Sequence, residues 1–164
     1  MGMEMSIEEA LKRAIQTEKN AMDFYRRGAG KMRDAGAKRV FELLAREERE
    51  HAETFYQVYP GKEIADFQAF MAVDPEEGAG WLAELGAELA ELDERKALQV
   101  ALDKEQKLEQ SLREMAARIE DPQVRAVFEE NARSTHNHYL LIESEYARLM
   151  GMVHESDIDT FVRE

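Results

Sequence analysis

The sequence predicts an all-α protein, a bundle of four long helices with a long crossover between the second and the third. Apolar residues recur at helical spacing, and the second half of the chain repeats the first at a constant offset. The chain has 164 residues, of which 44% are hydrophobic and 35% charged, with only three prolines. This length and composition suit one folded domain with a full core.

The first helix is expected to begin at Ser6, because Ser6 followed by Glu9 forms a capping box. Its apolar positions are Ile7, Leu11, Ala14, Ala21, Tyr25 and Met32. Glu18 is the only charged residue in that stripe. Glycines at 28, 30 and 36 are expected to loosen its end, with a turn near Asp34 to Ala37.

The second helix is predicted over residues 40–59, and it ends at Pro60-Gly61. Its stripe contains Phe41, Leu44, Glu48, His51, Phe55 and Val58. Glu48 and His51 are three residues apart, so their side chains lie on the same face of the helix, where the core should be.

Residues 60–93 are predicted to form a crossover that covers the bundle. Ile64 to Met71 is consistent with one short helix, and Asp74-Pro75 ends it. Residues 81–92 have a further apolar periodicity that is consistent with another helix.

The third helix is expected to begin after Asp93, and the fourth after Asp121, with Pro122 at its first position. The fourth helix is expected to end at Met150, before Gly151. The bundle then occupies residues 1–151, and residues 152–164 form a C-terminal tail. The third stripe contains Leu98, Ala101, Glu105, Leu108, Leu112, Met115 and Ile119. The fourth contains Val124, Phe128, Asn131, Thr135, His138, Ile142 and Leu149.

An internal repeat relates the two halves at an offset of 87 residues, without a gap. It pairs Ser6 with Asp93, Ala14 with Ala101, Glu18 with Glu105, Asp34 with Asp121, Phe41 with Phe128, and His51 with His138. Helix caps, apolar residues and polar residues of the stripes all fall at one register. The chain therefore consists of two helical hairpins joined by the crossover.

Five polar residues interrupt the apolar stripes and are candidate metal ligands: Glu18, Glu48, His51, Glu105 and His138. Burying them costs free energy unless something pairs with them, and a cation held by four helices would do so. A buried polar network without metal is the alternative. Carboxylate oxygens and imidazole nitrogens suit iron or manganese, and zinc is possible.

The net charge of −13 argues against nucleic acid or an anionic membrane as partner. No apolar run is long enough to cross a membrane. Cysteine is absent, which excludes thiol catalysis and Fe–S clusters. The first residues lack the pattern of a signal peptide, so a cytoplasmic protein is expected. Apolar residues in the crossover and the tail suggest a homodimer.

On these residues the chain resembles the rubrerythrin-type members of the ferritin-like superfamily. The resemblance covers all four helices and is carried by Glu18 to Tyr25, Glu48 to His51, Glu105, and His138-Tyr139. It implies a ferritin-like four-helix bundle with a non-haem di-iron site that reacts with peroxide or oxygen. A role against oxidative stress would follow.

The chain departs from the family pattern in the fourth helix. The position related to Glu48 holds Thr135, where the pattern has a bridging glutamate, and Leu108 replaces a further glutamate. We expect Thr135 and Asn131 to hold a water or hydroxide in the vacated place, and the hydroxyl of Tyr25 is a further candidate for contact with the site. Without cysteine the rubredoxin-like domain of rubrerythrins proper is missing, so an external electron donor is required.

The sequence therefore favours a rubrerythrin-like iron oxidoreductase that reduces peroxide or oxidises iron, with Glu48 bridging two ions. Three carboxylates carry less charge than two divalent ions, so the sequence is compatible with either one or two bound ions. The alternative function is a non-catalytic bundle that binds metal, stores iron or mediates interactions. A substrate hydroxylase is a third option.

Overall fold

The computed structural model describes residues 6–75 and 94–153, and these residues form helices and no strand. The helices are α1 (Ile7–Lys31), α2 (Ala35–Gln57), α3 (Phe67–Ala72), α5 (Glu94–Arg118) and α6 (Pro122–Val153). The chain is therefore all-α, as predicted. No helix within the described ranges is long and apolar enough to cross a membrane.

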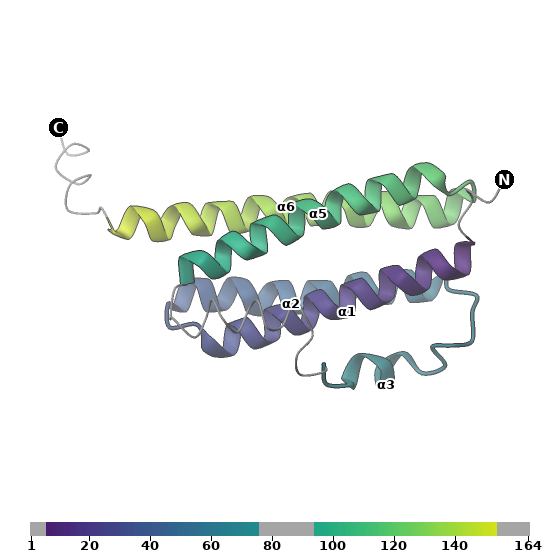
Figure 1. The fold of residues 1–164 in the computed structure, drawn as a ribbon, viewed down its shortest axis with the longest axis horizontal. Coiled ribbons are helices and arrows are strands. Elements are labelled where there is room, and N and C mark those ends of the chain that lie inside the picture. The colour runs from purple at the N-terminus through teal and green to yellow at the C-terminus, as the bar shows by residue number, and fades with distance from the viewer. Residues whose placement is uncertain (1–5, 76–93, 154–164) are drawn as a thin grey trace.

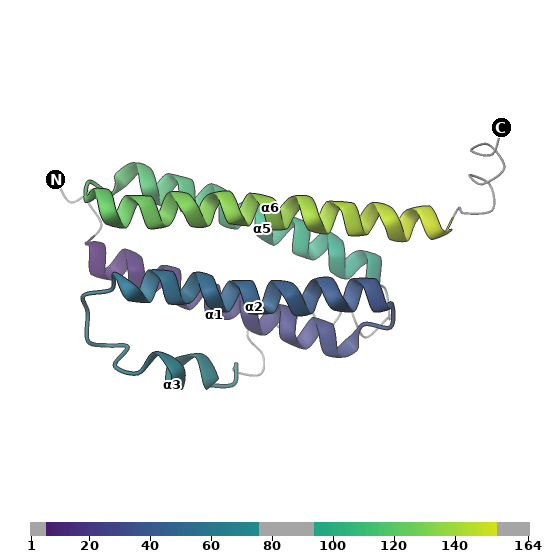
Figure 2. The ribbon, with the colours of Figure 1, turned by 180° about the vertical axis from the view of Figure 1, so that it is seen from behind.

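The four long helices form two antiparallel hairpins that lie side by side (Figure 1). Helices α1 and α2 form one hairpin, α5 and α6 the other, and α3 lies outside the first (Figure 2). The hairpins meet mainly along α2 and α6, whereas α1 and α5 approach each other less closely. Because α2 and α5 run in the same direction, the chain between them must return along the whole bundle.

Side-chain caps define where the long helices begin. Ser6 accepts a hydrogen bond from the Glu9 amide at 3.1 Å and caps α1, as the sequence predicted. Asp34 accepts from the Ala37 amide at 2.8 Å and caps α2. The predicted turn at Asp34 to Ala37 is thus slightly too late, because the side chain of Asp34 already starts the next helix.

The fourth helix begins at Pro122, as expected, with Asp121 accepting from the Val124 amide at 3.1 Å. It continues through Gly151 to Val153, so the predicted end at Met150 is wrong. Glycine weakens a helix without ending it. The predicted tail beyond residue 153 lies outside the described residues.

Gly28 has a packing role that the sequence interpretation missed. A Cβ atom at this position would lie 2.6 Å from the Phe41 ring. Gly28 lies within α1 rather than at its loosened end, and it lets α1 and α2 approach closely.

The core consists of two apolar clusters along the bundle. One contains Tyr25, Phe41, Leu98 and Ile142, and the other contains Leu11, Phe55, Leu112 and Phe128. In each long helix the charged or polar members of the predicted stripe lie between these clusters. The buried polar residues therefore occupy one layer in the middle of the bundle.

The described part of the crossover covers the outer face of the first hairpin. Phe67 and Met71 of α3 are buried, and the helix begins after the cap Asp66, three residues later than predicted. Lys19 forms a buried ion pair with Asp23 at 2.6 Å and donates to the Val73 carbonyl at 2.6 Å. The predicted helix at 81–92 and the cap Asp93 fall outside the described residues.

Candidate metal centre

The fold brings the five predicted ligands together in the middle of the bundle. Glu18 comes from α1, Glu48 and His51 from α2, Glu105 from α5 and His138 from α6. The carboxylates of Glu18 and Glu48 are fully buried, and none of the five residues is more than 7% exposed. Three acidic side chains at this depth need positive partners.

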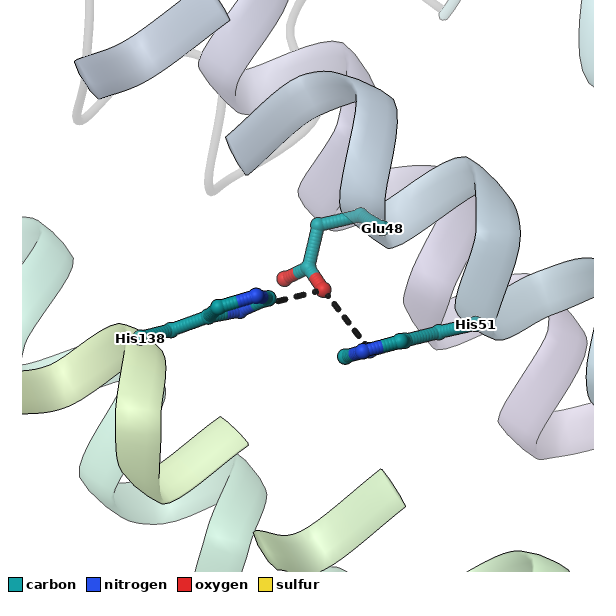
Figure 3. A group of neighbouring side chains, drawn as sticks. All are labelled: Glu48, His51 and His138. Carbon is teal, nitrogen blue, oxygen red and sulfur yellow. Dashed lines mark ion pairs between the residues drawn. The ribbon is translucent and has the colours of Figure 1, made fainter. Parts of the chain in front are cut away.

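Glu48 lies between the two histidines (Figure 3). Its Oε1 is 3.0 Å from Nδ1 of His51 and 3.6 Å from Nδ1 of His138. Each histidine also faces a carboxylate from the first helix of its own hairpin. Nδ1 of His51 is 3.5 Å from Glu18, and Nδ1 of His138 is 3.4 Å from Glu105.

The two histidine rings are stacked, with centroids 5.1 Å apart and planes 9° from parallel. His51 and His138 are partners in the 87-residue repeat. The repeat therefore has a spatial counterpart, a local twofold relation between the hairpins that passes through this centre.

Apart from these ion-pair contacts with one another, most polar atoms of this centre have no hydrogen-bond partner. They are both carboxylate oxygens of Glu18 and of Glu48, Oε2 of Glu105, Nδ1 of His51 and of His138, and Oγ1 of Thr135. Carboxylate oxygens and imidazole nitrogens that converge in this way could hold a cation. One ligand atom each of Glu48, His51 and His138 lie within 4.8 Å of one another.

The electrostatics of the centre favour positive charge. Burial raises the pKa of Glu48 well above its ordinary value, and the carboxylates of Glu105 and Glu18 raise it further. Burial by itself would lower the pKa of His51, but Glu18 and Glu48 raise it to about 11. Burial would also lower the pKa of His138, but the Glu105 carboxylate favours the charged imidazole. The pKa of His138 is therefore raised. Protons compensate the carboxylates when no other cation does.

The outer nitrogens of the two histidines contact side chains of the opposite hairpin. Nε2 of His51 is 2.8 Å from Oγ of Ser134, and Nε2 of His138 is 2.7 Å from Oε1 of Glu47. These contacts turn both Nδ1 atoms toward the inner carboxylates. Sequence reasoning missed both residues, although Glu47 and Ser134 are partners at the 87-residue offset.

Tyr25 reaches the centre, one of the outcomes considered for it from the sequence. Its hydroxyl donates to Glu105 at 2.8 Å. Burial raises the pKa of Tyr25 well above its ordinary value, and the nearby Glu105 carboxylate adds to this. The repeat partner of Tyr25 is Leu112, so the two first-helix carboxylates differ in their surroundings.

Thr135 is fully buried and lies one helical turn before His138, as Glu48 lies one turn before His51. Asn131 is also buried, and its amide nitrogen donates to Thr54 at 3.0 Å and to the Val127 carbonyl at 2.8 Å. The expectation that Thr135 and Asn131 hold a water or hydroxide stays a prediction.

His136 is half exposed and pairs with Glu109, the two side chains being 3.0 Å apart. Glu109 also pairs with Arg113 at 2.8 Å. Neither His136 nor Glu109 joins the buried group.

The family model for rubrerythrin matches residues 9–146, which include all five predicted ligands and most of both hairpins. No curated protein and no solved structure matches the chain significantly. Because the match covers most of the chain, the protein belongs to the rubrerythrin family.

Proposed function

We propose that the protein is a non-haem iron oxidoreductase that reduces peroxide, with ferrous iron oxidation as its other reaction. The observation that carries this proposal is the group of buried carboxylate and imidazole atoms, contributed by four helices, that lack hydrogen-bond partners. Membership of the rubrerythrin family supports iron as the metal.

The proposed ligand roles follow the local twofold relation. Glu48 lies between the histidines and would bridge two ions. Glu18 with His51 would hold one ion, and Glu105 with His138 would hold the other. Iron bound there would supply Lewis acidity and two electrons, which together with two protons convert peroxide into two waters.

The surrounding residues hold the ligands in position. Tyr25 donates to one oxygen of Glu105 and leaves Oε2 for a metal. Ser134 and Glu47 hold the outer nitrogens of the histidines. Metal binding must displace the protons that the centre retains, so metal affinity should rise with pH.

The number of ions depends on charge. Glu18, Glu48 and Glu105 supply three negative charges, against four positive charges from two divalent ions. Glu47 adds a carboxylate, but it contacts His138 rather than the inner face. The position opposite Glu48 in the repeat holds the neutral Thr135. One of the two positions should therefore bind metal less tightly.

A second candidate function follows from the same residue. With a threonine in place of a bridging carboxylate, the bundle would bind one ion, such as zinc, without redox chemistry. Zinc accepts carboxylate and imidazole ligands.

The test begins with protein expressed and purified without added metal. Two irons per chain with the absorption of an oxo-bridged ferric pair, and oxidation of the reduced protein by peroxide, are expected. His138→Ala should remove one metal position, and His136→Ala on the same helix should remove none. One colourless ion per chain would favour the second candidate function. Full metal content in His138→Ala would contradict the assignment of His138 as a ligand under either candidate function.

A further inference from the structure

The two halves of the candidate metal centre are related by the repeat, but their contacts differ. The first half consists of Glu18 and His51, and the second half consists of Glu105 and His138, with Glu48 between the histidines (Figure 3). The second pair follows the first at the 87-residue offset, so the repeat alone would make the two halves equivalent. The differences between them bear on which half binds metal more tightly.

The inner nitrogen of His51 has a closer carboxylate than the inner nitrogen of His138. Nδ1 of His51 is 3.0 Å from Glu48 and 3.5 Å from Glu18. Nδ1 of His138 is 3.6 Å from Glu48 and 3.4 Å from Glu105. Glu48 precedes His51 by one turn of the same helix, which keeps the two side chains on one face. A cation at His51 is therefore closer to negative charge than a cation at His138.

The carboxylates of the two first helices also differ in the oxygen that they present to the histidine. Oε1 of Glu105, which faces His138, accepts a hydrogen bond from the Tyr25 hydroxyl at 2.8 Å. Oε2 of Glu18, which faces His51, has no hydrogen-bond donor of this kind. The repeat places Leu112 at the position of Tyr25, and leucine has no hydroxyl. The first half therefore offers more unbonded ligand atoms than the second.

The helix that carries each histidine adds a further difference. Glu48 lies one turn before His51, whereas the fully buried and neutral Thr135 lies one turn before His138. Glu47 acts in the opposite direction, because its contact with Nε2 of His138 at 2.7 Å makes that imidazole a stronger ligand. This contact is at the outer nitrogen, however, so it adds no ligand atom on the inner face.

We infer that the half formed by Glu18 and His51 binds the first metal ion, and that Tyr25 keeps the affinity of the other half lower through its hydrogen bond to Glu105. Tyr25 is thus a positioning residue, since it acts on the metal through a carboxylate. The inference rests on the ligand roles proposed above and requires no redox chemistry. It applies whether the centre binds two ions or one.

The test uses zinc, which has no redox chemistry, bound to the full chain. A chelator of increasing concentration removes zinc at constant pH, and we expect two release steps whose Kd values differ about tenfold. His138→Ala should lose the weaker step and keep the Kd of the tighter step within about twofold. His51→Ala should bind only an ion that is weaker than the first ion of the parent. Thermal melting of each zinc-loaded variant checks that it folds.

The parent protein can report the same order without any substitution. NMR spectra of the imidazole nitrogens are recorded while zinc is added to the metal-free chain. One equivalent of zinc should give the resonance of a metal-bound nitrogen at His51. The resonance of a metal-bound nitrogen at His138 should follow only with the second equivalent.

Tyr25→Phe tests the cause of the difference. It keeps the ring and removes the hydroxyl, so the Kd of the weaker step should fall about threefold while that of the tighter step stays unchanged. Tyr146→Phe is the matched control, because it removes a hydroxyl that accepts from Gln99 at 2.9 Å within the second hairpin. It should change neither step. A loss of packing alone would weaken both steps, so a selective shift identifies an effect through Glu105.

Three results would overturn the inference. The first is a metal-bound nitrogen at His138 before His51. The second is loss of the tighter step in both histidine variants, which would mean that one ion lies between the two histidines. The third is a weaker step that is unchanged in Tyr25→Phe.

The redox function can fail separately from this inference. Zinc that fills the halves in the expected order, in a protein whose iron-loaded form does not react with peroxide, would support the inference and contradict the redox function. The reverse order, in a protein that does reduce peroxide, would overturn only the inference.

Discussion

The two hairpins share their helix caps and the position of their buried polar residues. They differ in one residue of the central layer and in the residues beneath the crossover. Both begin their second helix with a capping aspartate, and both place a glutamate of their first helix and a histidine of their second helix in the central layer. The first hairpin has Glu48 where the second has Thr135. It also buries Lys19 and Asp23 beneath the crossover, whereas their partners Gln106 and Gln110 are exposed.

This comparison separates the residues that both hairpins need in order to fold from the residues that only one hairpin has. The capping aspartates and the pair Phe41 and Phe128 are retained because both hairpins need them to fold, whereas the core residue Tyr25 is replaced by Leu112. Among the residues that differ, Thr135 lies in the central layer, whereas Lys19 and Asp23 lie beneath the crossover, and the described crossover covers only the first hairpin. The differences are therefore the positions at which substitution is most informative.

Thr135→Glu makes the second hairpin resemble the first, and we expect it to have the largest effect. A fourth buried carboxylate adds like-charge repulsion, so the metal-free variant should lose about 3 kcal/mol of stability relative to the parent. It also balances two divalent ions, so occupancy of the weaker metal position should rise. Chemical denaturation with and without metal, together with metal analysis, measures both.

Asn137→Glu adds the same charge to the exposed surface of α6 and is the matched control. A Thr135→Glu protein with the stability and metal content of this control would show that position 135 does not face the centre. The 87-residue register would then fail in α6, and His138 would lose support as a ligand.

Asp23→Asn tests the buried ion pair that only the first hairpin has. It keeps the shape of the side chain but leaves the Lys19 ammonium buried without its carboxylate, which should cost about 3 kcal/mol. Gln110→Asn at the related exposed position of α5 should change stability by less than about 0.5 kcal/mol. Equal unfolding midpoints for the two variants would show that the pair contributes nothing to stability.

Most of the fold follows from the sequence because its signals are local or repeated. The Ser6 and Asp121 caps and the apolar stripes report helices directly. The 87-residue offset indicates which helices form hairpins and predicts that Glu18, Glu48 and Glu105 share one layer. Burial of Lys19 could not be predicted, because it depends on where the crossover passes over α1.

The contacts between hairpins are the part of the site that the sequence could not provide. Ser134 and Glu47 are separated from their histidines by 83 and 91 residues. Their contacts depend on how far α2 and α6 are apart and how they are rotated. The bond from Asn131 to Thr54 also crosses between the hairpins, and it could not be predicted for the same reason.

Glu47→Gln and Ser134→Ala compare these two outer contacts. An imidazole bound to a carboxylate through its outer nitrogen is a stronger metal ligand than one bound to a hydroxyl. We therefore expect Glu47→Gln to weaken metal binding about tenfold and Ser134→Ala to weaken it about threefold. Competition with a coloured chelator measures both affinities. Glu53→Gln, on the exposed face of α2, is the control. If all three variants bind metal alike, the histidines do not need their outer partners.

Asp34→Asn and Asp121→Asn compare the two capping aspartates, and here the expected difference is smallest. Asparagine caps a helix about as well as aspartate, so both variants keep their caps. Asp34 also contacts Arg148 of the other hairpin. Among the described residues, Asp121 forms no ion pair. Because these side chains are partly exposed, Asp34→Asn should cost only about 0.5 kcal/mol more than Asp121→Asn.

The pH dependence of that difference gives the sharper test. The Ala37 amide and, after it, Arg148 lower the pKa of Asp34 in the folded protein. A lowered pKa means that the carboxylate stabilises the fold above its unfolded pKa, and that this contribution is lost as the pH falls through the folded value. The stability of the parent and of Asp34→Asn should therefore differ near neutral pH and converge in acid. A difference that persists below the folded pKa would mean that Asp34 acts through its shape as a cap, and that its charge does not link the hairpins.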